Sequence, residues 1–332
     1  MREVSKAITA LSTLGDYIVS KPTELHEIIQ IAYQHNGWFS PDNCWRALFA
    51  IANDYLNEEK LASFASSYQI PTSNPKTVGL ILAGNLPLVS FHDILCVLLS
   101  GHNAQIKLSS KDDKLTRAIL MKLGQLSENF NKQIEIVDRL SDYDAVIATG
   151  SDNSVRYFEQ YFGNYPNIIR GNRTSLAVLT GSETKVDYQN LGKDVFYYYG
   201  LGCRNVTFLL VPTGFNFEPL LNGFAAYENT LNNQKYKNNF DYNLTLFLIN
   251  TVPHLQGDAI ILSEEESLHS RIAVLHYKEY KTKDDLNNFI IKHNKDLQVV
   301  VGKEFTPFGQ AQEPTLSDFA DHVDTMAFLS KL

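Results

Sequence analysis

The 332-residue sequence predicts an α/β protein that contains a doubly wound parallel sheet and a second, separate α/β domain. Apolar strands and amphipathic helices alternate between residues 77 and 162, which is typical of parallel strands joined by crossover helices. A helical segment precedes this alternation, and a further set of strands follows residue 200. The length exceeds that of one typical domain, which also indicates more than one folding unit.

Residues 1–66 are predicted to be helical and to pack on the domain that follows, which we place at residues 67–192. Leu25, Ile28 and Ile29 recur at helical spacing. Ser40 followed by Pro41 is a helix start, with the serine as cap and the proline in the first turn. The loop at residues 71–75 is rich in proline and polar residues, which marks it as a boundary.

A β-α-β unit follows this loop and predicts parallel strands with a right-handed crossover. Its first strand starts at Thr77 and ends in a Gly-Asn turn, a buried helix runs over 88–100, and the next strand covers 104–110. The remaining predicted elements of the sheet are a helix over 112–126, strands over 133–137 and 144–149, and a helix over 152–162. Ligands of such sheets bind beyond the carboxyl ends of the strands. Five residues fall at such ends: Asn85, Ser109, Ser110, Gly150 and Ser151.

The second half of the chain predicts another α/β domain, at residues 193–314, and a C-terminal helix and tail at 315–332. Leu316, Phe319 and Val323 recur at helical spacing in the tail. The elements predicted before it are a strand-turn-strand over 167–181, a helix over 186–199, a polar helical stretch over 216–251, strands over 259–262, 272–276 and 297–301, and a helix over 284–293.

Cys203 is the candidate nucleophile of the chain. Gly200 and Gly202 stand just before it, and glycine allows positive φ and a close approach of the backbone to a ligand. A helix that began at or just after Cys203, with the charge of Arg204 beside it, would favour the thiolate. An activated thiolate is the form that attacks substrates. The alternative is that Cys203 is a small buried hydrophobic residue.

Composition excludes several function classes. The formal net charge of −8 argues against nucleic acid and against an anionic membrane surface as partners. Three cysteines are too few for a disulfide framework or a zinc site, so we expect a reducing cytoplasm and no metal. No run reaches 18 apolar residues, so no membrane span is expected.

Five motifs occur in an order that resembles the aldehyde dehydrogenase superfamily, and within it the LuxC-type acyl-CoA reductases. The resemblance extends from about Val78 to Leu329. The motifs are Gly84-Asn85-Leu86-Pro87, Ile106-Lys107-Leu108-Ser109-Ser110, Thr149-Gly150-Ser151, Gly200 to Cys203, and Pro307-Phe308-Gly309.

The resemblance implies a chemistry for these residues. Cys203 matches the family's thiol, which attacks an acyl-CoA thioester and releases coenzyme A; hydride from a reduced nicotinamide then yields the aldehyde. Asn85 matches the asparagine of the oxyanion hole, where it acts with the backbone N–H of Cys203. The resemblance thus implies that residues 67–192 bind the cofactor and that 193–314 carry the catalytic thiol. Without the resemblance, Asn85 would be assigned as a left-handed turn residue.

One departure from the family favours the reductases that depend on coenzyme A. Hydrolytic members carry a Glu-Leu-Gly-Gly motif, in which the glutamate activates water. The matching stretch here is Arg170-Gly171-Asn172-Arg173, and arginine stays protonated at neutral pH. We therefore expect poor hydrolysis of a thioester. Arg170 and Arg173 are candidates for structural pairing, which we favour, or for contact with coenzyme A phosphates.

A second departure concerns the cofactor. Where the family has Lys-Pro-Ser-Glu at the adenosine ribose, this chain has Lys107-Leu108-Ser109-Ser110. Ser110 removes a charge that would repel a 2′-phosphate, which predicts NADPH (NADP). Gly150 and Ser151 match the place where a helix N-terminus meets the dinucleotide, and Phe308 matches a residue beside the nicotinamide. The simpler alternative is that the three serines only begin helices.

The sequence leaves several alternatives open. The chain could be a non-catalytic or weakly active binding subunit of a larger complex. An acyl phosphate or an acyl carrier protein could replace acyl-CoA as the donor. The aldehyde could pass to a protein that consumes it, an acyl-transfer protein could supply the acyl group, and a homo-oligomer is expected from the superfamily.

Overall fold

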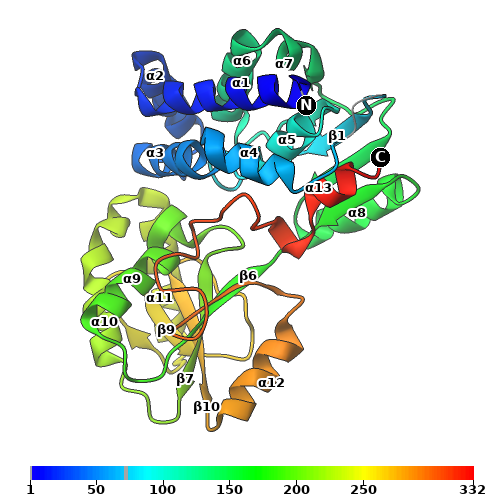
Figure 1. Cartoon of the computed structure of the whole chain (residues 1–332). Helices are drawn as coiled ribbons and strands as arrows, with labels where there is room; N and C mark the ends of the chain where they lie inside the picture. The colour runs from blue at the N-terminus through cyan, green and yellow to red at the C-terminus, as the bar shows by residue number, and fades with distance from the viewer. Residues whose placement is uncertain (1, 71–73) are drawn as a thin grey trace. The chain divides into compact units, whose positions relative to one another are not determined.

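The computed structural model describes residues 2–70 and 74–332, which form two compact units (Figure 1). Unit 1 comprises the chain up to Asn172 together with Pro314–Leu332, and unit 2 is Arg173–Glu313. The predicted N-terminal helices and C-terminal tail therefore belong to the same unit as the first sheet. The predicted boundary at 192/193 differs from this division, which falls at 172/173. The loop expected at 71–75 lies mostly outside the described residues.

Unit 1 contains a five-stranded parallel sheet in the order β3-β2-β1-β4-β5. Successive strands run outward from β1 in one direction and then, from β4, in the other, so the sheet is doubly wound as predicted. The order reverses between β1 and β4, which is where ligands of open α/β sheets bind. The strands are β1 (Thr77–Ile81), β2 (Asn103–Lys107), β3 (Ile134–Ile136), β4 (Ala145–Thr149) and β5 (Asn167–Arg170).

The N-terminal helices of unit 1 form one hydrophobic core with the sheet and the helix α5 (Phe91–Leu99). Leu11, Leu48 and Val97 are fully buried in this core. The predicted cap at Ser40 is confirmed, since its side chain accepts a hydrogen bond from the Asn43 N–H. The other helices of the unit are α1 (Arg2–Val19), α2 (Thr23–His35), α3 (Pro41–Ala50) with the π-helical turn Ile51–Tyr55, α4 (Glu58–Ser66), α6 (Asp113–Leu126), α7 (Glu128–Gln133) and α8 (Asp152–Phe162).

Unit 2 contains a six-stranded sheet in the order β11-β6-β7-β10-β9-β8, in which β8 alone is antiparallel to its neighbour. Phe208 of β7 stacks on Phe289 of α12, with ring centroids 5.3 Å apart. The strands are β6 (Thr174–Val178), β7 (Val206–Pro212), β8 (Leu255–Gln256), β9 (Ile261–Glu264), β10 (Val274–Tyr280) and β11 (Leu297–Val301). The helices are α9 (Lys185–Phe196), α10 (Glu218–Phe224), α11 (Gln234–Ile249) and α12 (Lys283–His293).

The structure corrects the prediction of a helix over 315–329. Only α13 (Thr325–Leu329) and the short 3₁₀ turn Ala320–His322 are helical there. Asp321 and His322 have φ of 58°, a left-handed conformation that breaks a helix. Leu316 and Phe319 are nevertheless buried, so their spacing reflects packing onto unit 1 and not helical periodicity. In Figure 1, α13 lies beside α5, which is far away in the sequence.

The strand-turn-strand predicted over 167–181 is confirmed as β5 and β6. The two strands enter different sheets, because β5 belongs to unit 1 and β6 to unit 2. The helix α7 was not predicted; its short polar stretch carries little apolar periodicity, although Ser127 caps it by accepting a hydrogen bond from the Phe130 N–H.

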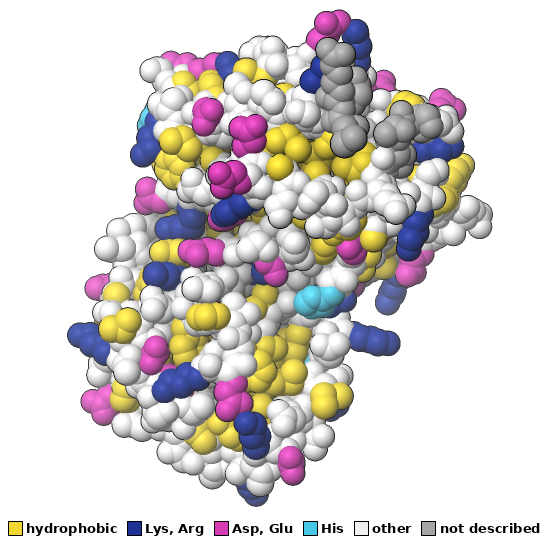
Figure 2. Space-filling model, in the orientation of Figure 1, with side chains coloured by type: hydrophobic (Ala, Val, Ile, Leu, Met, Phe, Trp, Pro, Cys, Tyr) yellow, Lys and Arg dark blue, Asp and Glu magenta, His cyan; other side chains and the backbone are white. Residues whose placement is uncertain are grey.

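No helix in the described part of the chain is both long and apolar enough to cross a membrane. Acidic and basic side chains are interspersed on the face shown in Figure 2, and neither sign dominates a large area of it.

Candidate active site

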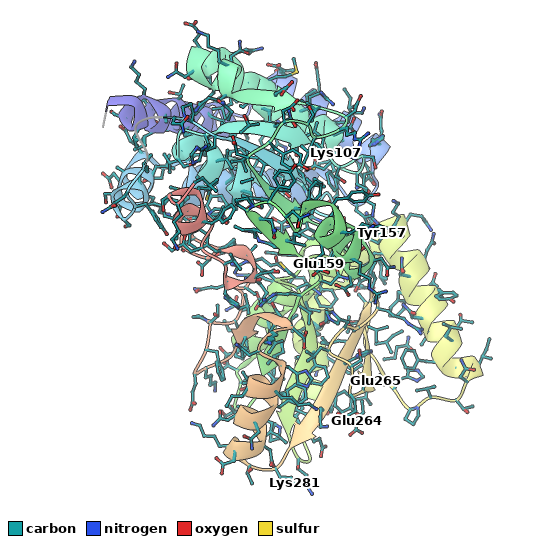
Figure 3. All side chains as sticks on the ribbon, turned by 90° about the vertical axis from the view of Figure 1, so that its right-hand side faces the viewer. Lys107, Tyr157, Glu159, Glu264, Glu265 and Lys281 are labelled. Carbon is teal, nitrogen blue, oxygen red and sulfur yellow. The ribbon has the colours of Figure 1, made fainter. Side chains whose placement is uncertain are left out.

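The residues predicted to lie at strand ends do gather along one edge of the sheet in unit 1. Asn85 follows β1, Lys107 ends β2, and Gly150 follows β4. The strands β2, β1 and β4 are adjacent and parallel, so their carboxyl ends share this edge. Asn85, Lys107, Ser110 and Ser151 all have exposed side chains. Lys107 is labelled at the end of its strand in Figure 3.

The turn that carries Asn85 is held firmly by its neighbours. The Ala83 N–H donates to Ser90 Oγ over 3.1 Å, and the Leu88 N–H donates to Asp112 Oδ2 over 2.8 Å. A Cβ at Gly84 would lie 2.4 Å from Ser109 Oγ, so only glycine fits there. The left-handed residue of this turn is Leu88, with φ of 57°, and not Asn85.

Asp112 is the residue that fixes the turn, and the sequence analysis did not identify it. Its carboxylate also accepts a hydrogen bond from Thr116 Oγ1 over 2.8 Å, while Oδ1 has no partner among the described residues. Burial raises the pKa of Asp112 to about 7, against the opposing effect of the hydrogen bonds from Leu88 and Thr116. A buried carboxyl near the start of a helix resembles an ordinary cap in sequence, so no signal distinguished it.

The loop after β2 is anchored to the end of α2. His35 Nε2 contacts the Ser110 carbonyl at 2.8 Å, and Asn36 Nδ2 donates to the Lys111 carbonyl over 3.2 Å. The helix that follows begins at Asp113, with Asp112 at its cap position. The Ser109 hydroxyl accepts a hydrogen bond from the Lys111 N–H, so Ser109 closes the loop, whereas the exposed side chain of Ser110 is not at the helix cap.

Gly150 and Ser151 lead from β4 into α8. Ser151 is the cap residue of this helix in an extended conformation, and its hydroxyl lies 3.1 Å from that of Ser154. A Cβ at Gly150 would lie 2.8 Å from both Ser154 Cβ and the Phe158 ring, so glycine permits this close packing. Figure 3 labels Tyr157 and Glu159 on the same helix.

Arg170 pairs inside unit 1, as the favoured alternative predicted. Its guanidinium is fully buried; Nη1 lies 2.6 Å from Asp93 Oδ2, and Nη2 donates to Thr325 Oγ1 over 2.8 Å. Arg173 lies in unit 2, where its Nη1 donates to the Leu297 carbonyl. The buried position of Arg170 leaves it without access to a phosphate.

Cys203 lies in a turn of unit 2 and its side chain is half-buried. The strand β7 begins at Val206 and no helix starts at Cys203, so the condition under which a helix N-terminus would favour the thiolate is not met. The Cys203 carbonyl accepts a hydrogen bond from Ser175 Oγ over 2.9 Å. The same hydroxyl accepts one from the Val299 N–H over 3.1 Å, so Ser175 ties the turn to β6 and β11.

The backbone before Cys203 is strained. Gly200 and Gly202 have φ of 73° and 96°, as their type predicted. Tyr198 and Tyr199 also have positive φ, of 54° and 60°, which is uncommon for bulky side chains. Such conformations cost free energy and concentrate at functional sites.

The other two thiols differ from Cys203. Cys44 and Cys96 are fully buried in the core of unit 1. Burial raises the pKa of Cys44 to about 12 and that of Cys96 well above its ordinary value. Both thiols therefore stay protonated and unreactive at neutral pH. Of the three cysteines, Cys203 is the one that is not fully buried.

The loop that carries Phe308 is a tight turn. The Gln310 N–H donates to the Pro307 carbonyl over 3.2 Å, and Gly309 has φ of 86°. Phe308 is half-buried. Asp194 of α9, which the sequence analysis did not single out, accepts hydrogen bonds from the Gly309 N–H over 2.6 Å and from the Ala311 N–H over 3.0 Å. An acidic residue within the buried face of a helix was the signal that could have revealed it.

The described residues contain no cluster of His, Cys, Asp or Glu suited to a metal ion. Asn85 belongs to unit 1 and Cys203 to unit 2, so each is positioned by its own sheet.

Comparison with sequence families gives one match, which extends from unit 1 into unit 2. Residues 60–218 match the sequence profile of a family described as acyl-CoA reductase (LuxC). No curated protein matches the chain.

Solved structures with a similar fold include aldehyde dehydrogenases. One is a putative aldehyde dehydrogenase from Burkholderia cenocepacia, with 14% identity and a TM-score of 0.66 over 93% of this chain and 76% of that one. An acetylating aldehyde dehydrogenase from Geobacillus thermoglucosidasius has 11% identity and a TM-score of 0.64 over 91% and 77%. A mutant aldehyde dehydrogenase C from Pseudomonas syringae, solved with NAD⁺ and octanal, has 13% identity and a TM-score of 0.64 over 90% and 71%.

Proposed function

From the match of residues 60–218 to the acyl-CoA reductase (LuxC) family, and from the likeness of the fold to aldehyde dehydrogenases, we infer that the chain is a LuxC-type reductase of the aldehyde dehydrogenase superfamily. We propose that it reduces an acyl-CoA thioester to an aldehyde with NADPH. The family makes it an oxidoreductase of acyl or aldehyde groups; the donor, the cofactor and the residues are our proposal. The observation that supports it best is Cys203, a half-buried thiol in a strained glycine turn, whereas the other two cysteines are buried.

In the first step the Cys203 thiolate attacks the carbonyl carbon of the thioester. A new C–S bond to Cys203 forms, the bond to coenzyme A breaks, and the coenzyme leaves as a thiolate that takes up a proton from solvent. The side-chain N–H₂ of Asn85 and the backbone N–H of Cys203 donate to the oxyanion that develops on the carbonyl oxygen. Donors placed in this way lower the barrier by favouring the transition state over the ground state.

In the second step the acyl group leaves Cys203 as an aldehyde. A bound NADPH supplies the hydride that the carbonyl carbon accepts. Asn85 again stabilises the negative oxygen, and Cys203 departs as a thiolate, ready for the next acyl group. Arg170 occupies the stretch where hydrolytic relatives carry a glutamate, and as a buried, permanently charged partner of Asp93 it offers no base for water.

We propose that a dinucleotide binds at the edge of the sheet in unit 1. The order of strands reverses between β1 and β4, and the N-terminus of α8 begins beside the end of β4. We propose that Lys107, Ser109 and Ser110 bind the adenosine ribose and its 2′-phosphate, and that Gly150 and Ser151 contact the pyrophosphate. Phe308 is proposed to border the nicotinamide. Coenzyme A enters as part of the substrate.

Incubation with a series of acyl-CoA thioesters of increasing chain length is expected to oxidise NADPH with release of one thiol per NADPH consumed. Spectrophotometry follows both, and trapping with a hydrazine identifies the aldehyde. If an acyl phosphate or an acyl carrier protein is reduced and no acyl-CoA is, then that compound and not acyl-CoA is the donor. Absence of NADPH binding by calorimetry would instead favour a non-catalytic binding subunit that works with a protein partner.

The substitution Ser110→Glu is expected to shift the cofactor preference from NADPH toward NADH. A carboxylate at this exposed position would repel a 2′-phosphate and accept hydrogen bonds from the ribose hydroxyls. We expect the ratio of kcat/KM for NADPH to that for NADH to fall about ten- to hundredfold, since like charges brought together in a binding site cost several kcal/mol. Ser110→Gln, similar in size but uncharged, is the matched control and should change the ratio little. A wild-type preference for NADH, or an equal effect of the two variants, would contradict the proposal.

A further inference from the structure

We propose that Asp194 is a positioning residue for the reduction step, because its carboxylate holds the loop Pro307–Ala311 in a fixed relation to the turn that carries Cys203. The inference rests on the proposed function, and it assigns a role to a residue outside the motifs that led to that function.

The contacts of Asp194 are made with the backbone of the loop. Its side chain is fully buried in α9, nine residues before the thiol. Its two oxygens accept hydrogen bonds from the Gly309 N–H and the Ala311 N–H, at 2.6 and 3.0 Å. Hydrogen bonds to a charged acceptor are stronger than those between neutral groups. Two such bonds to one carboxylate fix the orientation of the loop as well as its distance from α9.

The loop is also attached on the other side of the thiol. Arg204, which directly follows Cys203, donates from Nη1 to the Ala311 carbonyl over 3.4 Å. Ala311 is therefore held at its N–H by Asp194 and at its carbonyl by Arg204. The segment that carries Cys203 thus contacts the loop from the helix before the thiol and from the turn after it.

Gly309 makes this attachment possible. Its φ of 86° is favoured by glycine, and a Cβ there would lie 3.2 Å from both the carbonyl oxygen and the Cβ of Asn190 in α9. The loop backbone consequently packs directly on the helix, and Phe308 projects from a turn whose next residue is bound. A group that must meet a reacting atom benefits from such rigidity, since a misplacement of about 1 Å can cost about a hundredfold in rate.

The ionisation of Asp194 makes the attachment of the loop depend on pH. Burial raises its pKa to about 7, opposed by the hydrogen bonds from Gly309 and Ala311; Glu313 raises it further, and Lys193 lowers it. Arg204, in the turn after Cys203, is the other charged group that contacts the loop. Below the raised pKa the carboxyl group loses its charge, and the oxygen that takes up the proton becomes a weaker acceptor for its N–H. The attachment should therefore weaken as the pH falls from about 8 to 6.

The test compares Asp194→Asn with wild type in two measurements. Hydrogen–deuterium exchange of the full chain is expected to quicken at the Gly309 and Ala311 amides, because an Asn side chain offers one acceptor and opposes the second N–H with its own donors. In single turnover, hydride transfer should slow about ten- to hundredfold, while release of coenzyme A in the acylation step stays within about threefold of wild type. The fall in the reduction rate of wild type between pH 8 and 6 should be missing from the variant.

Asn243→Ala is the matched control for a general loss of stability. Asn243 is buried in α11 of the same unit and donates to the Ile272 carbonyl, which lies outside the loop. This variant should lower stability without separating the two steps. The inference is overturned if Asp194→Asn leaves exchange at Gly309 and Ala311 unchanged, or if acylation and reduction slow equally. The exchange measurement needs no substrate, so it tests the attachment of the loop to Asp194 even if the proposed reaction is wrong.

Discussion

Replacing Cys203 with alanine is expected to abolish both formation of the acyl-enzyme and reduction of acyl-CoA. The variant removes the only atom that is proposed to bond to the acyl group, and the loss of a nucleophile from a working set of residues costs on the order of 10⁴- to 10⁶-fold in kcat. Incubation with radioactive acyl-CoA, followed by denaturation and gel analysis, measures the label on the protein. NADPH oxidation in the same samples measures turnover.

The structure supplies controls for this result. Cys44→Ala and Cys96→Ala remove thiols that are buried in unit 1, so both variants should keep the label if they fold. Asn85→Ala keeps the nucleophile but loses one donor to the oxyanion, which typically costs about 2.7–4 kcal/mol of barrier. Label retained on Cys203→Ala, or label that disappears only with one of the buried thiols, would exclude the proposed mechanism.

Replacing Arg170 with methionine is expected to lower the free energy of unfolding by about 3–5 kcal/mol, because removal of one partner of a buried ion pair leaves the other charge uncompensated. Arg170 is 2% exposed and Asp93 10% exposed, so water cannot take the place of the guanidinium. The Thr325 hydroxyl would lose its donor as well. Urea unfolding followed by circular dichroism gives the change.

The double variant Arg170→Met with Asp93→Leu distinguishes pairing from packing. With both charges removed, most of the lost stability should return, since a buried pair and a well-packed apolar pair are often equivalent. If the single variant loses less than about 1 kcal/mol, the ion pair is not the stabilising contact that its geometry indicates.

Much of unit 1 could be predicted because its local signals agree with its global arrangement. The strands at Thr77 and Ala145 are short apolar runs with turn residues behind them, and the crossover rule then determines which edge carries Asn85 and Gly150. The cap at Ser40 could be predicted from the sequence Ser-Pro-Asp alone. Cys203 stays a predicted nucleophile, but the positive φ expected of the glycines before it is confirmed.

What could not be predicted depends on contacts between distant parts of the sequence. Asp112 and Asp194 are ordinary acidic residues until the backbone N–H groups of Leu88, Gly309 and Ala311 are placed against them. The tail was misassigned as a helix because burial of Leu316 and Phe319 happens to produce the same spacing. Likewise, nothing local shows that β5 and β6 enter different sheets.

The return of Pro314–Leu332 to unit 1 has a consequence for synthesis on the ribosome. The Leu316 and Leu329 carbonyls contact His92 and His102, and Tyr68 donates to Asp324, so this segment completes the first unit. Translation must therefore pass through all of unit 2 before these partners emerge. The first unit therefore stays incomplete while some 140 further codons are translated. During this time it is open to chaperone binding, and a chain that terminates early would lack the segment that completes it.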